Sequence, residues 1–185
     1  MLLDQLLLSR ASVDRAAHRR TDSNWLDEQL RSPHTKVLLL SGGHFPAHQD
    51  RVQWLSMSDT TDLIVHEHYL LGVTNGIAYI AARVDGDLPN PATLFDMGSV
   101  LDSHDVGLVT TAVALGHWHE SHQYCAKCGS KLASTSAGWS RTCPADATEV
   151  FPRTDPAVIA LPIFGDRALL GSRFNWPDNR FSCFA

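Results

Sequence analysis

Two short stretches, Cys125-Ala-Lys-Cys128-Gly129 and Cys143-Pro-Ala-Asp146, are the most informative part of this sequence. Two thiolates two residues apart can bind one Zn²⁺, because the tight turn between them points backbone N–H groups at sulfur. Gly129 relieves the crowding of that turn. The second stretch repeats the spacing, with aspartate in the last position. The pattern C-x2-C-x14-C-x2-D therefore predicts a zinc ribbon with four ligands, Cys125, Cys128, Cys143 and Asp146.

All four predicted ligands come from the chain and leave no open position for water, so we expect the zinc to be structural. A lone CxxC can instead be a redox dithiol, but that motif usually begins a helix in a βαβ setting, which this sequence does not predict. The fourth ligand stays open between Asp146, which we favour, and His119 or His122, and a further alternative is that the site has lost its metal.

The composition of the 185 residues limits the class of protein. With 44% hydrophobic residues and a formal net charge of -5, the chain is expected to be globular, with one domain or two small ones. No apolar run approaches the roughly 20 residues that span a bilayer. The first ten residues lack the cationic start of a secretory signal, so we expect a cytoplasmic protein with unpaired cysteines. Charges of opposite sign cancel between His117 and Asp155, which disfavours nucleic-acid binding by the ribbon.

Local patterns outline the remaining elements. Residues 2–31 mix helix formers, and a second helix is expected to begin near Ser23 with Trp25, Leu26 and Leu30 on one face. The further expectations are a buried strand over 36–40, a β-hairpin over 71–80 that turns at Asn75-Gly76, a helix over 105–122, and strands over 157–161 and 168–170 around a Gly165-Asp166 turn.

The sequence around the ribbon resembles a known family. In order along the chain come His117-Trp-His-Glu-Ser-His-Gln-Tyr-Cys-Ala-Lys-Cys-Gly129, Gly138-Trp139, Cys143, Val150-Phe-Pro-Arg153 and Asp155-Pro-Ala-Val-Ile159. This order is similar to the NADH pyrophosphatases of the Nudix superfamily, in which a helix leads into a zinc ribbon and the ribbon into the Nudix fold. The stretches 8–20 and 97–100 are similar to the amino-terminal domain of that family.

The resemblance implies an activity and a set of contacts. Members cleave the pyrophosphate of NAD(H) to nicotinamide mononucleotide and AMP, and some remove NAD caps from RNA. It implies that Phe151 contacts the substrate, by stacking on adenine or nicotinamide, and that backbone atoms of Ala185 lie beside it. It also implies a homodimer. An alternative for Phe151 is packing between the ribbon and the next sheet. Gly138 and Leu101 replace a glutamate and an arginine that contact substrate in some members.

The catalytic element of Nudix enzymes is missing from these residues. That element, G-x5-E-x7-R-E-U-x-E-E-x-G-U, gathers glutamates around Mg²⁺ or Mn²⁺, which activate water and neutralise charge on the pyrophosphate. The chain has four glutamates, Glu28, Glu67, Glu120 and Glu149, and no two are closer than 29 residues. We therefore expect no catalytic residue within the 185, no activity of these residues alone, and a catalytic box beyond Ala185.

The sequence thus predicts an α+β chain with three parts. These are an amino-terminal domain over 1–104, a helix plus zinc ribbon over 105–155, and the start of a Nudix domain over 156–185. The predicted function is NAD(H) diphosphatase. Two alternatives remain: a non-catalytic zinc-ribbon scaffold that binds a partner, and an enzyme that uses His117, His119 or His122.

Overall fold

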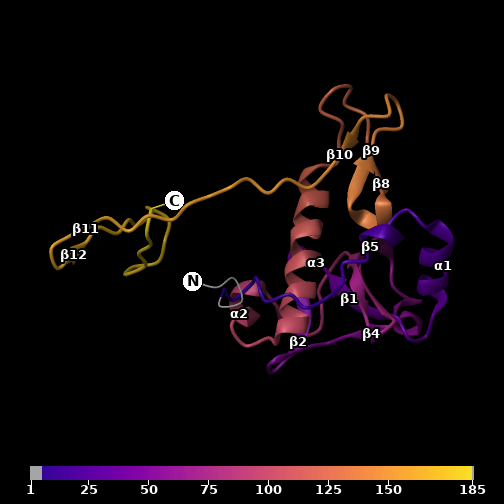
Figure 1. Ribbon diagram of the computed structural model, residues 1–185, viewed down its shortest axis with the longest axis horizontal. Coiled ribbons are helices and arrows are strands. Elements are labelled where there is room, and N and C mark those ends of the chain that lie inside the picture. The colour runs from indigo at the N-terminus through magenta and orange to yellow at the C-terminus, as the bar shows by residue number, and fades with distance from the viewer. Residues whose placement is uncertain (1–5, 185) are drawn as a thin grey trace. The chain divides into compact units, whose positions relative to one another are not determined.

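The computed structural model describes residues 6–184, which form two compact units divided between Pro152 and Arg153. The first unit combines helices with small sheets (Figure 1), which confirms the predicted α+β class. The boundaries of the three predicted domains stay predictions. Within the described residues, no helix combines the length and the apolar character that crossing a membrane requires.

A four-stranded sheet is the frame of the first unit, in the order β4-β1-β6-β5. β1 and β6 are parallel, and each outer strand is antiparallel to its neighbour. The predicted hairpin is confirmed, since Asn75 and Gly76 join β5 to β6 with φ of 51° and 77°. The strands are β1 (Lys36–Leu40), β4 (Leu55–Ser56), β5 (Val65–Thr74) and β6 (Ile77–Val84).

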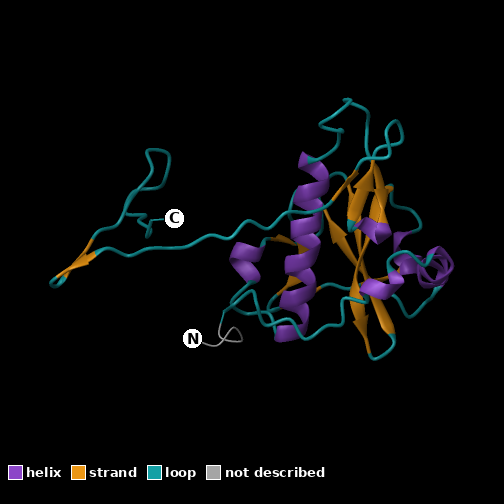
Figure 2. Cartoon of the chain, turned by 45° about the horizontal axis from the view of Figure 1, so that its top comes forward, coloured by secondary structure: helices purple, strands orange, loops and turns teal. Residues whose placement is uncertain are grey.

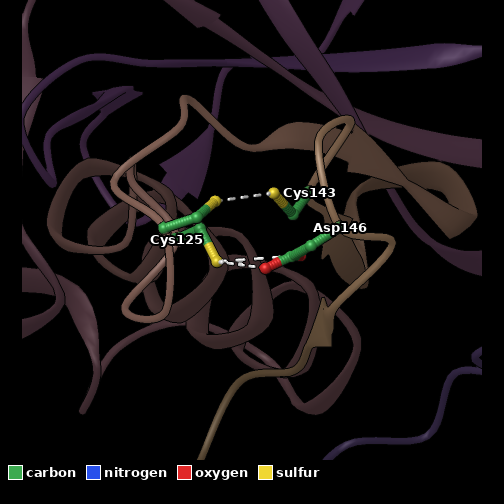
Figure 3. A group of neighbouring side chains, drawn as sticks. Cys125, Cys143 and Asp146 are labelled. Carbon is green, nitrogen blue, oxygen red and sulfur yellow. Dashed lines mark hydrogen bonds between the residues drawn. The ribbon is translucent and has the colours of Figure 1, made fainter.

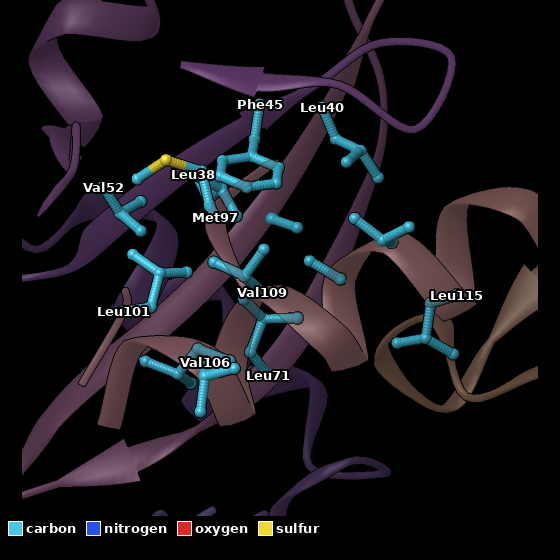
Figure 4. Packing of buried hydrophobic residues seen from close by; sticks show 14 of the residues in the cluster. Leu38, Leu40, Phe45, Val52, Leu71, Met97, Leu101, Val106, Val109 and Leu115 are labelled. Atoms are coloured by element: carbon cyan, nitrogen blue, oxygen red, sulfur yellow. The ribbon is translucent and has the colours of Figure 1, made fainter. Parts of the chain in front are cut away.

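Helix α3 (Ser103–Ser121) packs along this sheet (Figure 2). It begins where the Asp102 carboxylate accepts hydrogen bonds from the His104 and Asp105 N–H groups. Ten residues of the helix are buried, because besides the main sheet it packs against Phe45 and Val52 of the same apolar cluster and against Ala11 at Gly107. The core between the main sheet and α3 is shown in Figure 4; its members include Leu38, Leu40, Phe45, Leu71, Leu101, Val106, Val109 and Leu115.

The smaller elements complete this unit. Helix α1 begins at Ser23 as predicted, with the Asp22 carboxylate accepting from Trp25 N, and it ends before Pro33. Before it, the described residues contain one short 3-10 turn and no α-helix, so the helix formers there do not form one; residues 1–5 lie outside the described part. The elements are η2 (Ala17–Arg19), α1 (Ser23–Arg31), β2 (Phe45–His48), β3 (Arg51–Val52), η3 (Met57–Thr60), β7 (Pro91–Ala92) and α2 (Leu94–Met97).

The ribbon is a three-stranded antiparallel sheet, β10-β9-β8, that follows α3 directly. Two loops at its far end carry the cysteines (Figure 1). Its elements are β8 (Ala133–Thr135), η4 (Ser136–Gly138), β9 (Ser140–Thr142) and β10 (Glu149–Val150).

The second unit, taken by itself, contains little regular structure. The Gly165-Asp166 turn is confirmed between β11 (Ile163–Phe164) and β12 (Arg167–Ala168). The strands predicted over 157–161 and 168–170 are largely wrong, because Ala160 makes only an isolated bridge to Phe184 and β12 ends at Ala168. The apolar side chains here are exposed, so nothing in this unit supplies the buried face that a strand needs.

Candidate metal centre and its junction with the amino-terminal domain

The structure brings the four predicted metal ligands together at the tip of the ribbon. Figure 3 shows three of them, Cys125, Cys143 and Asp146, facing one another. Their donor atoms all lie within 4.8 Å of one another. The Sγ atoms of Cys128 and Cys143 are 3.4 Å apart, and Cys125 Sγ is 3.7 Å from Asp146 Oδ2. Tetrahedral zinc with bonds of about 2.3 Å to sulfur and about 2.1 Å to oxygen requires separations of about 3.6–3.8 Å. The donor set therefore fits a closed structural zinc site, although the ligand assignment stays a prediction.

The two loops that carry these ligands are built alike. In the first, Gly129 N–H donates to Cys125 O and Cys125 N–H donates to Ser130 O. In the second, the N–H of Ala147 donates to Cys143 O and that of Cys143 to Thr148 O. The residue after each final ligand is left-handed, Gly129 at φ 75° and Ala147 at φ 59°. The Cys143–Asp146 stretch therefore folds like the CxxC loop, which places the carboxylate where a fourth thiolate would lie.

The protonation of Asp146 suits a metal ligand. Its Oδ1 accepts a hydrogen bond of 2.9 Å from the Thr148 N–H, and this bond holds the pKa of the carboxyl well below its usual range. Lys127 Nζ lies 3.9 Å from Oδ2. Asp146 is thus ionised at neutral pH, with one oxygen oriented by the backbone and the other directed at the thiols.

Neither alternative histidine reaches the cluster. His119 Nε2 donates to Gly138 O at 2.8 Å, and its Nδ1 lies 2.9 Å from Arg141 Nη1. His122 Nδ1 is 2.9 Å from Ser121 Oγ, and its ring lies beside Trp118. Both rings therefore have other partners, and of the three candidates the structure places only Asp146 among the sulfurs.

A buried charged network joins the ribbon to the amino-terminal domain. Arg141 on β9 is 4% exposed, and its guanidinium donates to the carbonyls of His119 and Leu132 at 3.0 Å each. Arg141 Nη2 lies 3.5 Å from Glu67 Oε1 on β5, and His119 Nδ1 lies 3.3 Å from Glu67 Oε2. Tyr69 donates to the same oxygen at 2.9 Å. One carboxylate of the main sheet therefore contacts both the ribbon and helix α3.

Glu67 is ionised in this network. Burial raises the pKa of its carboxyl, but contacts with His119, Tyr69 and Arg141 outweigh burial and lower the pKa to about 2. Sequence reasoning missed this group because the partners are distant in the chain. The only available signal was an acidic residue between His66 and His68, shortly before the predicted hairpin. Of these, His66 pairs with Asp85 at 2.7 Å and His68 is partly buried.

The resemblance concerns four positions at the substrate: Phe151 and Ala185 as predicted contacts, and Gly138 and Leu101 as replacements of contacts. Phe151 follows β10 and is 57% exposed, so within its unit it is not packed against a sheet. Ala185 lies outside the described residues. Gly138 has φ 87°, and a Cβ there would collide with the Tyr69 side chain, which accounts for glycine at this position. Leu101 is fully buried in the core, where an arginine would have no route to a ligand.

A second group of potential donors, Asp102, His104 and Asp105, lies at the start of α3. Asp102 caps the helix, while Asp105 accepts from Trp54 Nε1 at 3.1 Å. These groups have structural partners, and the positive end of the helix dipole disfavours a cation there.

Removing the Asp146 carboxylate should weaken zinc binding. We expect Asp146→Ala to lower zinc affinity by more than about 100-fold, the upper end of what losing an outer-shell partner costs. Asp146→Cys should bind zinc more tightly, because a thiolate is the softer ligand. Competition with a chromogenic chelator measures both, and Asp155→Ala is the control. Equal affinities of wild type and Asp146→Ala would show that Asp146 is not a ligand.

Neutralising Glu67 should destabilise the chain. We expect Glu67→Gln to lower the free energy of unfolding by about 2–4 kcal/mol at pH 7, because Arg141 would keep its charge in a buried site. The folded pKa lies below the unfolded value, so the difference is fully present above about pH 4.5 and is lost as pH falls toward 2. Denaturant titration at fixed zinc measures this.

The exposed Glu120 on α3 provides the matched control, since Glu120→Gln removes the same charge and should change stability by less than about 0.5 kcal/mol. If the two variants are equally stable, the Glu67 network contributes nothing to the fold.

Comparison with known proteins agrees with this geometry. The family model described as "NADH pyrophosphatase zinc ribbon domain" matches residues 120–151, which hold all four predicted ligands. Human "NAD(P)H pyrophosphatase NUDT13, mitochondrial" is 34% identical over 85 residues, covering 46% of this chain and 24% of that protein.

Longer matches extend over nearly the whole chain. The "NAD-capped RNA hydrolase NudC" of Mycobacterium tuberculosis (strain ATCC 25618 / H37Rv) is 34% identical over 195 residues, as is its counterpart in Mycobacterium bovis (strain ATCC BAA-935 / AF2122/97). Each match covers 97% of this chain and 60% of the relative, so the chain spans about three fifths of the length of these proteins. The chain is therefore similar along nearly its whole length to proteins of this kind, and its residues 120–151 match the zinc ribbon of the NADH pyrophosphatases.

Proposed function

We propose that the chain forms the amino-terminal and zinc-ribbon part of a Nudix-type NAD(H) diphosphatase, which yields nicotinamide mononucleotide and AMP. The observation that carries this proposal is the similarity over 97% of the chain to proteins named NAD-capped RNA hydrolase. NAD-capped RNA is therefore a second proposed substrate. The enzyme is proposed to act in the cytoplasm as a homodimer.

The described residues are proposed to support this reaction without supplying its catalytic carboxylates. Among residues 6–184, Glu67 is committed to the junction with Arg141, and the acidic group at α3 is committed to the helix start. The four glutamates of residues 1–185 are scattered along the sequence and do not form the group that holds Mg²⁺ or Mn²⁺ in Nudix enzymes. When bound, those ions would neutralise charge on the pyrophosphate and activate water.

Phe151 is the proposed substrate contact within the described part. Its ring is exposed, and it follows Val150, which pairs with Arg141 in the ribbon sheet. Since Arg141 is fixed by the buried network, the backbone leading to Phe151 is held in place. An exposed aromatic ring on a fixed strand end suits stacking on a base or on nicotinamide. Ala185 is proposed as a backbone contact.

The test uses the full natural product of the gene that encodes these residues. We expect it to convert NADH to the reduced mononucleotide and AMP with added Mn²⁺ or Mg²⁺, measured by chromatography, while residues 1–185 alone show no turnover. Phe151→Ala should lower kcat/KM by at least about tenfold, because stacking on one base contributes about 1–3 kcal/mol.

Phe151→Tyr keeps the ring and is the control, with activity near that of wild type. Turnover by residues 1–185 alone would refute the placement of the catalytic glutamates. If the full product has no such activity but binds a protein partner, the chain is a zinc-ribbon scaffold instead.

A further inference from the structure

The segment Arg15-Ala-Ala-His-Arg-Arg20 places three arginines and a histidine in six residues, in a chain whose net charge is -5. Part of it forms the 3-10 turn η2, and it lies against the base of the ribbon through Trp139. The segment is thus local positive charge on an otherwise acidic protein.

Trp139 orients two of these arginines. The Arg20 guanidinium lies over the indole ring with Cζ 3.5 Å from the ring centroid, and Arg15 Cζ lies 5.9 Å from it. Trp139 Nε1 donates to Leu70 O at 2.7 Å, which fixes the ring against the main sheet. Stacking occupies the face of a guanidinium and leaves the donors at its edge free for a planar or tetrahedral oxyanion.

The charges of Arg15 and Arg20 are not compensated within the described chain. No carboxylate of residues 6–184 lies within 4.0 Å of either guanidinium. The flanking acids have other partners, since Asp14 accepts from Ala16 N–H at 2.8 Å and Asp22 pairs with Arg19 at 3.2 Å. Among the described residues, Arg20 Nε is buried and has no hydrogen-bond partner. The side-chain hydrogen bond of Arg20 runs from Nη2 to the Arg15 carbonyl, at 3.3 Å.

The electrostatics of Arg20 favour an anion beside its guanidinium. Burial, and then the charge of Arg15, lower the pKa of its guanidinium, so the folded protein holds two like charges close together. An oxyanion beside both guanidinium groups would relieve this repulsion.

We propose that Arg15 and Arg20, held on Trp139, form a contact surface for the phosphate backbone of single-stranded RNA. The inference rests on the proposed function, because an NAD-capped RNA continues as a polyanion beyond the dinucleotide. Residues 1–185 carry a net charge of -5, so a polyanion is expected to approach them through a local cationic surface. Stacked arginines that track a backbone are typical of sequence-independent single-strand binding.

Fluorescence anisotropy with a labelled single-stranded RNA of about 20 nucleotides tests the proposal, over salt from about 50 to about 200 mM. Each phosphate contact on a single strand contributes about 0.7 to the slope of log K against log salt. We therefore expect Arg15→Gln/Arg20→Gln to reduce the slope by about 1.4 and the affinity at the lowest salt by roughly tenfold to a hundredfold.

Arg51→Gln is the matched control for the single variant Arg15→Gln, since the Arg51 side chain is 88% exposed and each substitution changes the net charge by one. It should change affinity by less than about twofold. If loss of Arg20 unfolds the chain, as judged by thermal melting, Arg15→Gln alone should still reduce the slope by about 0.7.

Equal slopes in wild type and the double variant would overturn the proposal, as would salt-independent binding. The measurement involves no turnover, so its failure is distinct from that of the proposed function: an active diphosphatase with unchanged RNA binding would refute this surface alone.

Discussion

The ribbon has a small apolar core of its own, so we expect its fold to depend on a metal held by four donor atoms at one centre. Its buried apolar cluster consists of Cys125, Leu132 and Cys143, with Val150 packed beside them, and two of the three buried members are themselves predicted ligands. Three strands of two or three residues cannot bury enough surface to fold independently. A metal bound by both loops supplies the missing stabilisation, as in other small metal-dependent units.

Strand β9, which leads into Cys143, links the predicted metal loops to the rest of the first unit. Arg141 lies two residues before Cys143 and pairs with Val150 in the ribbon sheet. The same side chain contacts Glu67 of the main sheet and the His119 carbonyl of α3. The metal loops, the amino-terminal domain and the strand that leads to Phe151 are therefore connected through one buried guanidinium. A buried charge of this kind is costly unless fully paired, which favours one orientation of the ribbon.

Local chemistry could be predicted from the sequence, and long-range chemistry could not. The CxxC loop, the Asn75-Gly76 hairpin and the α1 start depend on neighbouring residues, and all three appear where the pattern places them. The Glu67–Arg141 contact joins residues distant in the chain, and no spacing rule indicates it. The strand predicted over 157–161 is wrong for a related reason: its residues favour strand locally, but the described chain offers no neighbouring strand to pair along its length.

X-ray absorption at the zinc K-edge tests the central claim most directly, because it counts the sulfur and oxygen neighbours of the metal. With three cysteines and Asp146 as ligands, we expect about one zinc per chain, with three sulfur atoms at about 2.3 Å and one oxygen at about 2.0–2.2 Å. Asp146→Cys should convert this shell to four sulfurs at about the same distance. A protein that retains no zinc, a shell with fewer than three sulfurs, or the outer-shell scattering of an imidazole ring would show that these four residues do not hold the metal.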